Sequence, residues 1–152
     1  MDVFSALEHS FLARALKSSF FLYPLVNALH ILSIGVLLTS VILMDLRVLG
    51  AFETLPRAPF VALLRRLALT AFCVALLTGF AMFTIRATEY ASMPIFLAKM
   101  SLVALAAANF ALFVTLERRK FGAVSPALRL SAAASVGLWL GVLVCGRFIG
   151  FL

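Results

Sequence analysis

The sequence predicts an all-α integral membrane protein, a bundle of four membrane-spanning helices preceded by a short amphipathic helix. The chain has 152 residues, of which 64% are hydrophobic and 12% charged, with a mean hydropathy of +1.16. A soluble domain is about half apolar and about a quarter charged. Four apolar runs reach the roughly 20 residues that a helix needs to cross a hydrocarbon core. These runs are apolar on every side, which favours helices over the alternating strands of a membrane barrel.

The elements follow one another within a single transmembrane domain, residues 1–152. Residues 2–17 have apolar side chains at helical spacing and most of their polar side chains elsewhere, which predicts an interfacial helix. An acidic start and the lack of a small-residue cleavage site argue against a secretory signal. The four membrane spans are predicted at residues 20–44, 67–85, 95–116 and 130–148.

Lys and Arg are unevenly distributed between the two ends of the predicted bundle. Basic loops tend to stay in the cytoplasm, so we expect a multi-pass protein of a bacterial inner membrane with both termini outside. Lipid headgroups account for the net charge of +7, and nucleic acid is excluded as a partner. Eight basic residues lie on the expected inner side and four on the outer side, namely Arg47, Arg57, Arg65, Arg66, Arg118, Arg119, Lys120 and Arg129 against Arg14, Lys17, Arg86 and Arg147.

A few polar side chains interrupt the spans, and these are the first place to look for function. Asn27 and His30 are three residues apart on one face of the first span. His30 is expected about 15 Å below the outer surface at helical rise. Lys99 is expected about one turn into the third span. The expected topology therefore gathers the polar groups in the outer half of the membrane.

A lone histidine inside a membrane span has several interpretations. A side-chain metal cage is disfavoured, since the spans offer no second histidine, carboxylate pair or CxxC motif, and Cys73 and Cys145 are interpreted as packing residues. No Ser/His/Asp set is visible in the spans. Haem needs only one or two side-chain ligands and suits an apolar cleft between helices. A plain hydrogen bond from His30 to a neighbouring helix remains the alternative.

The residues around His30 give the haem hypothesis its details. We predict haem b with His30 as its metal ligand and with Asn27 orienting the second ring nitrogen. Cations at the outer rim are expected to pair with the two propionates, namely Arg86, Lys99 and Arg147. An open sixth position is one option, and the side chains that could otherwise fill it are Met82, Met100, Lys99 and His9.

Three stretches carry a resemblance to a known family: "YPLVNALHILSIGVLLTSVILMDLRVLG", "LLTGFAMF" and "PIFLAKMSLVALAAAN". They resemble a bacterial family of small four-helix membrane domains of unknown function. Its pattern is a first-span His, an Asp-Leu-Arg and a Phe-x-x-Lys, matched here by His30, residues 45–47 and residues 96–99. The chain is more distantly similar to membrane protoporphyrinogen oxidases and to copper-resistance D proteins. The former are associated with haem b, so this resemblance implies haem at His30 by analogy.

Three functions follow as hypotheses. The first is a haem b membrane protein for electron transfer or for redox or gas sensing, with a redox protein or a quinone as partner. The second is an enzyme of tetrapyrrole metabolism that uses the same pocket, so whether the chain is an enzyme is left open. The third is a cofactor-free accessory or transport subunit.

Two other features of the spans have structural interpretations. Asp45 and Arg47, at the expected inner end of the first span, are expected to pair with one another or with loop charges. Gly137 and Gly141 form a small-xxx-small motif in the fourth span. This motif predicts close helix packing and is the proposed contact of a homo-oligomer.

Overall fold

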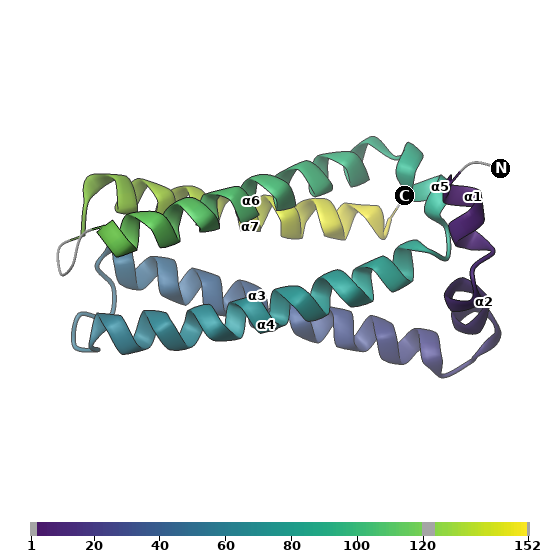
Figure 1. Ribbon diagram of the computed structural model, residues 1–152, viewed down its shortest axis with the longest axis horizontal. Helices are drawn as coiled ribbons and strands as arrows, with labels where there is room; N and C mark the ends of the chain where they lie inside the picture. Colours follow the sequence, from purple (N-terminus) through teal and green to yellow (C-terminus); the bar gives the residue numbers. More distant parts are fainter. Residues whose placement is uncertain (1–2, 120–123, 152) are drawn as a thin grey trace.

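The computed structural model describes residues 3–119 and 124–151, and within them every regular element is a helix. The predicted all-α fold class is confirmed (Figure 1). Lys120, which contributed to the topology argument, lies outside the described residues. The helices are α1 Val3–Glu8, α2 Phe11–Ser18, α3 Leu22–Leu49, α4 Arg57–Phe83, α5 Ala87–Ser92, α6 Pro94–Arg119 and α7 Pro126–Ile149.

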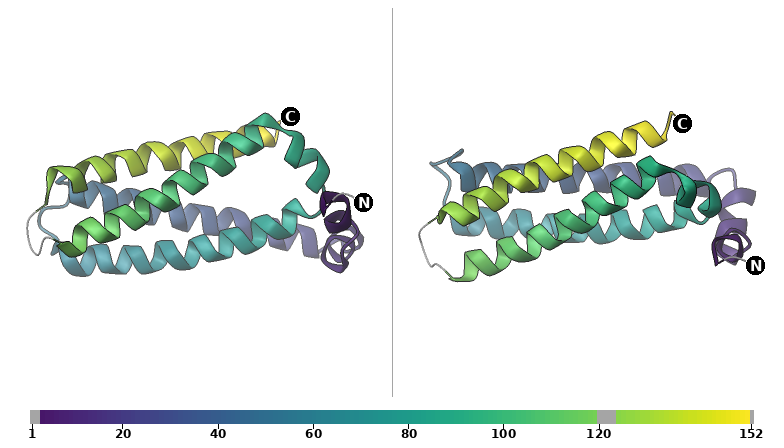
Figure 2. Two further views of the ribbon diagram at one scale, coloured as in Figure 1. Left: turned by 45° about the horizontal axis from the view of Figure 1, so that its top comes forward. Right: turned by 90° about the horizontal axis from the view of Figure 1, so that it is seen from above.

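Four of these helices, α3, α4, α6 and α7, are long and apolar enough to cross a membrane. Helix α3 packs along α4 and α7, and α6 packs along α7, whereas the backbones of α4 and α6 lie farther apart within the described residues. The bundle therefore consists of two helical hairpins, α3–α4 and α6–α7, that meet mainly where α3 contacts α7 (Figures 1 and 2).

Both ends of the chain lie at one end of the bundle, next to the short helices α1, α2 and α5 (Figure 1). We call this the α5 end, and we call the opposite end, which carries residues 50–56, the loop end. An even number of spans brings the termini to one side, as the sequence predicts. Which side of the membrane this is depends on the charge argument alone.

The spans are found where predicted, but two helices extend well beyond the apolar runs. Helix α3 continues to Leu49, and α4 begins at Arg57 rather than at residue 67. Hydropathy marks the apolar part of a helix, which is the part suited to hydrocarbon, whereas the helix itself can continue beyond it. The first turns of α4 carry Arg57, Arg65 and Arg66, which lower the hydropathy there. The predicted boundaries are therefore those of the apolar runs, not helix ends.

The predicted single helix at residues 2–17 is wrong in detail, because the chain forms α1 and α2 with a turn at His9. The hydroxyl of Ser10 accepts a hydrogen bond of 3.2 Å from the Ala13 N–H and so caps the start of α2. Serine favours this capping position, which ends one helix and starts another. Helix α5, in the connection between α4 and α6, was not predicted.

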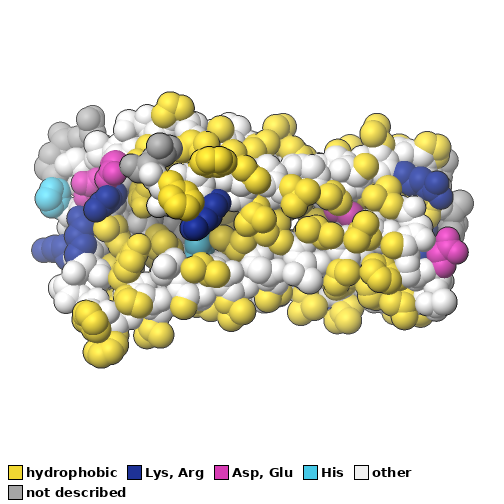
Figure 3. Space-filling model, turned by 180° about the vertical axis from the view of Figure 1, so that it is seen from behind, with side chains coloured by type: hydrophobic (Ala, Val, Ile, Leu, Met, Phe, Trp, Pro, Cys, Tyr) yellow, Lys and Arg dark blue, Asp and Glu magenta, His cyan; other side chains and the backbone are white. Residues whose placement is uncertain are grey.

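Two clusters of buried side chains form the core between the hairpins. Met44 and Phe113 belong to the first, and Leu37 and Trp139 belong to the second. Most other large apolar side chains are exposed and cover the outside of the bundle, while charged side chains gather mainly at its two ends (Figure 3). This distribution is the one expected of a protein whose solvent is lipid.

Polar contacts between helices support the two hairpins. Asn109 donates its amide to the Ser131 carbonyl at 2.9 Å, and the Ser131 hydroxyl donates to Asn109 Oδ1 at 3.0 Å. These bonds join α6 to α7. At the loop end, Arg65 on α4 forms an ion pair of 2.6 Å with Glu117 on α6. The two hairpins are therefore tied together at the end opposite α5.

The small-xxx-small motif of α7 is divided between two environments. An added Cβ at Gly141 would lie 3.2 Å from Leu102 Cδ1, so this glycine already lets α6 approach α7 within the chain. At Gly137 an added Cβ would meet nothing within 4 Å. Only Gly137 is left open for a contact with a second copy, so a homo-oligomer through both glycines would have to displace Leu102.

Candidate functional site

His30 lies on α3, and its imidazole packs against α4 at Gly79. A Cβ added at Gly79 would lie 3.0 Å from His30 Cε1, 3.6 Å from Nδ1 and 3.8 Å from Nε2. Carbon atoms in ordinary contact are about 3.5 to 4.0 Å apart. The lack of a side chain at Gly79 therefore leaves room for the His30 ring to pack this closely against α4.

The hydrogen bonds of His30 indicate which ring nitrogen carries the proton. Its Nδ1 is 2.9 Å from the hydroxyl oxygen of Thr78 on α4. That hydroxyl is placed to donate its single hydrogen to the Val74 carbonyl at 2.7 Å, and in this arrangement it accepts from the imidazole. The proton is therefore assigned to Nδ1 by the network. Nε2 keeps its lone pair and is the nitrogen free to bind a metal.

Asn27 lies one turn before His30 on the same helix and is half-buried. The sequence predicted that its side chain would orient the imidazole. The structure gives this role to Thr78, which comes from the neighbouring helix. Thr78 also bonds the Val74 carbonyl of its own helix, as helical hydroxyls commonly do, so its sequence position alone does not reveal the contact with His30.

Lys99 enters the same region from α6 of the other hairpin. Its Cε and Nζ would both lie 3.6 Å from a Cβ at Gly146 on α7, so a second glycine makes room for a polar side chain. The ammonium group is close enough to His30 to act on it electrostatically. Figure 3 shows a basic side chain directly beside a histidine side chain amid hydrophobic ones, away from the charged ends of the bundle.

The other two predicted rim cations are engaged elsewhere. Arg86 is exposed and forms an ion pair of 3.4 Å with Glu89 on α5. The guanidinium carbon of Arg147 lies 4.4 Å from the centre of the Phe151 ring. The rim of three cations therefore stays a prediction, with Lys99 as the member whose proximity to His30 the structure supports.

The candidates for a sixth ligand occupy different surroundings. Met82 lines a hollow at the α5 end together with Tyr23 and Tyr90. Met100 is exposed on the surface of α6, with 43% of its area accessible. His9 lies exposed in the turn between α1 and α2. Lys99 is the only one of the four that the structure places within electrostatic reach of His30.

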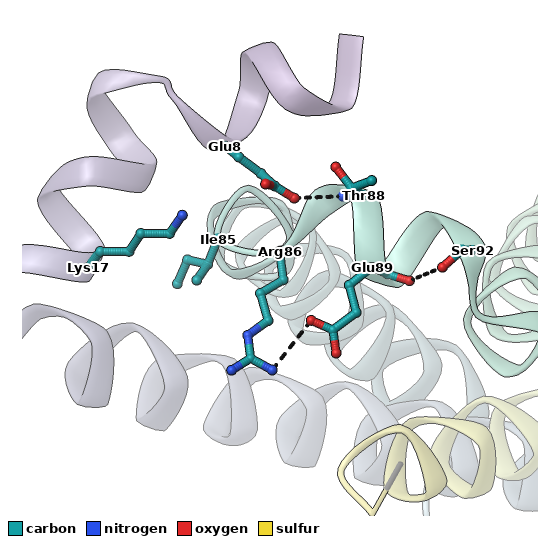
Figure 4. A pocket seen from close by; sticks show the side chains of 7 residues that line it. All are labelled: Glu8, Lys17, Ile85, Arg86, Thr88, Glu89 and Ser92. Carbon is teal, nitrogen blue, oxygen red and sulfur yellow. Dashed lines mark hydrogen bonds and ion pairs between the residues drawn. The ribbon is translucent and has the colours of Figure 1, made fainter. Parts of the chain in front are cut away.

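The α5 end carries two hollows of about 760 and 600 Å³. Figure 4 shows the larger hollow, where Glu8 from α1 reaches α5 and accepts a hydrogen bond of 2.8 Å from the Thr88 N–H. This bond keeps the pKa of Glu8 below its ordinary value. Lys17 and Arg86 line both hollows. The short helices thus cover this end with a mixed polar surface.

Aromatic side chains hold α5 against the long helices. The rings of Phe83 on α4 and Phe96 on α6 stack with their centroids 5.4 Å apart, and Tyr90 on α5 stacks on both. Burial raises the pKa of the Tyr90 hydroxyl, so this group stays neutral. Phe4 on α1 meets the edge of Phe83 at 6.2 Å. These rings close the bundle at the α5 end.

The predicted pairing of Asp45 with Arg47 or with loop charges is wrong. Arg47 instead donates two hydrogen bonds, of 3.1 and 2.8 Å, to the Leu55 carbonyl in the connection to α4. Asp45 is completely buried, and neither of its carboxyl oxygens has a hydrogen-bond partner among the described residues. Its helical position points it into the core, whereas Arg47 two residues later lies on another side of α3.

No group of three or more His, Cys, Asp or Glu that could hold a metal ion occurs in residues 3–119 and 124–151. The fold and the site define a small polytopic membrane protein in which an imidazole packs between α3 and α4 and an amine packs between α6 and α7. The chain belongs to the family described as "Family of unknown function (DUF6644)", which matches residues 3–152. No curated protein and no solved structure matches it. The more distant resemblance to protoporphyrinogen oxidases therefore stays a prediction.

Proposed function

We propose that this protein binds haem b through His30 and serves in electron transfer or in redox or gas sensing within the membrane. One observation carries the proposal. Nδ1 of His30 lies 2.9 Å from the Thr78 hydroxyl, which accepts the imidazole N–H when it donates its own hydrogen to the Val74 carbonyl at 2.7 Å. Metal-binding histidines commonly donate their second ring N–H in this way, which fixes the tautomer and the ring orientation.

The donor set fits haem better than it fits a bare metal ion. A bare ion needs three or four protein ligands, which the described residues do not offer around His30. A porphyrin brings four nitrogens of its own, so one imidazole is enough. Haem bound here would supply a one-electron redox centre or a site for a diatomic gas. His30 would hold the iron, Thr78 would orient the imidazole, and Gly79 would keep the ring against α4.

Lys99 is the residue we propose as the partner of a haem propionate. Its amine comes from the hairpin opposite His30, and Gly146 gives its stem room between α6 and α7. A propionate is costly to bury without a cation. Arg86 would have to leave its ion pair with Glu89 to bind a propionate, and Arg147 would have to leave the Phe151 ring. We therefore assign both arginines a secondary part in propionate binding.

We also propose the location, a bacterial inner membrane with the α5 end outside and the loop end in the cytoplasm. The support is the excess of Lys and Arg at the loop end, eight against four. With this orientation His30 and Lys99 lie in the outer half of the membrane. A redox partner or a quinone would then approach from the outer side.

The experiment is haem quantification on the purified protein and on matched variants. His30→Ala is expected to lose the bound haem, whereas His9→Ala keeps it. Thr78→Val removes the hydroxyl that orients His30 and is expected to weaken haem retention. Thr70→Val is its control, because Thr70 also lies on α4 and also bonds the carbonyl four residues back, but is exposed. Unchanged haem in His30→Ala contradicts the assignment.

The hydrogen bond between His30 and Thr78 also favours one alternative, the cofactor-free accessory subunit. In that function the bond serves only to join α3 to α4. Such a bond contributes on average about 0.6 kcal/mol inside a membrane. The same set of variants separates the two functions, since a purely structural bond predicts protein without haem in the wild type and reduced stability in Thr78→Val.

A further inference from the structure

Asp45 lies in α3 toward the loop end, away from the site around His30. Its side chain is fully buried, and both carboxyl oxygens lack a hydrogen-bond partner among the described residues. Native proteins rarely leave a buried polar group in this condition without a reason. An ionisable side chain inside a membrane span is by default a functional position.

The surroundings of Asp45 are apolar on most sides. Its neighbours in sequence, Met44 and Val48, belong to the core cluster that also contains Phe113. Ser135 on α7 is the polar group that faces the carboxyl group, although it does not reach hydrogen-bond geometry. Figure 3 shows an acidic side chain in a narrow gap between hydrophobic ones, away from both charged ends.

No described cation compensates the carboxyl group. Arg47 on the same helix is turned to the Leu55 carbonyl. Arg65 on α4 is bound to Glu117. The charged side chains on the helices that pack against α3 are Arg14 and Lys17 on α2, Arg57, Arg65 and Arg66 on α4, and Arg129 and Arg147 on α7.

We propose that Asp45 is a proton-binding site inside the membrane, which holds one exchangeable proton on its buried carboxyl group with Ser135 as its hydrogen-bond partner. An anion at this position would lose its hydration with at most the Ser135 hydroxyl as a donor and with no described cation bound to it, whereas a carboxylic acid is neutral. A metal ion is a poorer occupant, because no group of three acidic, His or Cys ligands exists in the described residues.

The exchange is a simple proton transfer. In the loaded state the proton is bonded to one carboxyl oxygen and is donated toward the Ser135 hydroxyl. On release this O–H bond breaks, the proton passes to water at the loop end, and the carboxylate keeps the bonding electron pair. The Ser135 hydroxyl then becomes the donor to the carboxylate. The site therefore needs only a small rearrangement between α3 and α7 to load and unload.

Infrared spectroscopy of the purified full-length protein tests the proposal. The C=O stretching band of a protonated carboxylic acid is expected at neutral pH, and it should shift in D₂O because the proton exchanges. Asp45→Asn, which is neutral and similar in shape, should abolish the band. Glu53→Gln is the control, since Glu53 is an exposed carboxylate at the loop end and should leave the band unchanged.

Ser135→Ala is a second variant for the infrared experiment, in case Asp45→Asn does not fold. Loss of the hydroxyl partner should move the band to higher frequency without removing it. Absence of the band in the folded wild type, or its persistence in Asp45→Asn, overturns the proposal. A band that never responds to D₂O also overturns it, since the proton would then be trapped rather than exchangeable.

Discussion

Substitution of Gly79 by alanine should disturb His30 without removing any polar group. The new Cβ would lie 3.0 Å from His30 Cε1, so the ring must move by about 0.5 Å to reach ordinary carbon contact. That movement lengthens the 2.9 Å bond to Thr78 to about 3.4 Å, beyond the usual range. Crowding in a packed interface costs about 1 to 3 kcal/mol, and the weakened bond about 0.6 kcal/mol. Alanine is more favourable than glycine within a helix by about 1 kcal/mol, which offsets part of this loss of stability.

Gly137→Ala is the matched control, because it makes the same exchange in a helix where nothing lies within 4 Å. Gly137→Ala should therefore keep the gain in helix propensity, and Gly79→Ala should be less stable than Gly137→Ala by about 1.6 to 3.6 kcal/mol, the sum of the crowding cost and the weakened bond. Thermal unfolding in detergent measures this difference, at about 2 to 4 °C for each kcal/mol in a chain of this size. Gly79→Ala should also retain less haem. Equal stabilisation by both substitutions would refute the close packing of His30 on α4.

Three other predictions follow from the site and the ends of the bundle. Lys99→Met should weaken haem retention or shift its reduction potential, whereas Lys99→Arg should preserve both; an unchanged potential in Lys99→Met would exclude Lys99 as the propionate partner. Because the folded pKa of Glu8 lies below its ordinary value of 4.5, the contact between α1 and α5 should be complete above that pH and lost as the pH falls through the folded pKa. The NMR shift of the Thr88 amide should follow this change in the wild type, and a titration that survives in Glu8→Gln would contradict the origin of the shift. A cysteine at Glu53 should be protected from an impermeant maleimide in intact cells while one at Thr88 is labelled, and the opposite pattern would reverse the topology.

The sequence predicted the fold well because lipid imposes simple demands. Long apolar runs must be helical when no water is present to satisfy the backbone, so all four spans lie where expected. The turn at His9 and the short helix α5 were missed. Their formation depends on the Ser10 cap and on the bond between Glu8 and Thr88, which are local polar contacts rather than periodic patterns.

The site was predicted only in part, for a physical reason that differs between its residues. His30 and Lys99 were found because polar groups in a span are conspicuous. Thr78 was not predicted as a site residue, since the hydroxyl of a helical threonine usually donates to a carbonyl of its own helix. Gly79 was not predicted either, because only the packing of α3 against α4 shows that the His30 ring occupies the space beside this glycine. Pairings across helices require the rotation of each helix about its axis, which the spacing of residues alone does not fix.

The most direct test of haem binding is the absorption spectrum of the wild-type protein, purified from haem-supplied cells and recorded in oxidised and reduced form. We predict a Soret band that shifts on reduction, with about one haem for each chain as expected for a single imidazole ligand. A folded protein that carries no haem, and that gains none when haem is added, would contradict the central claim and leave His30 as a structural link between α3 and α4.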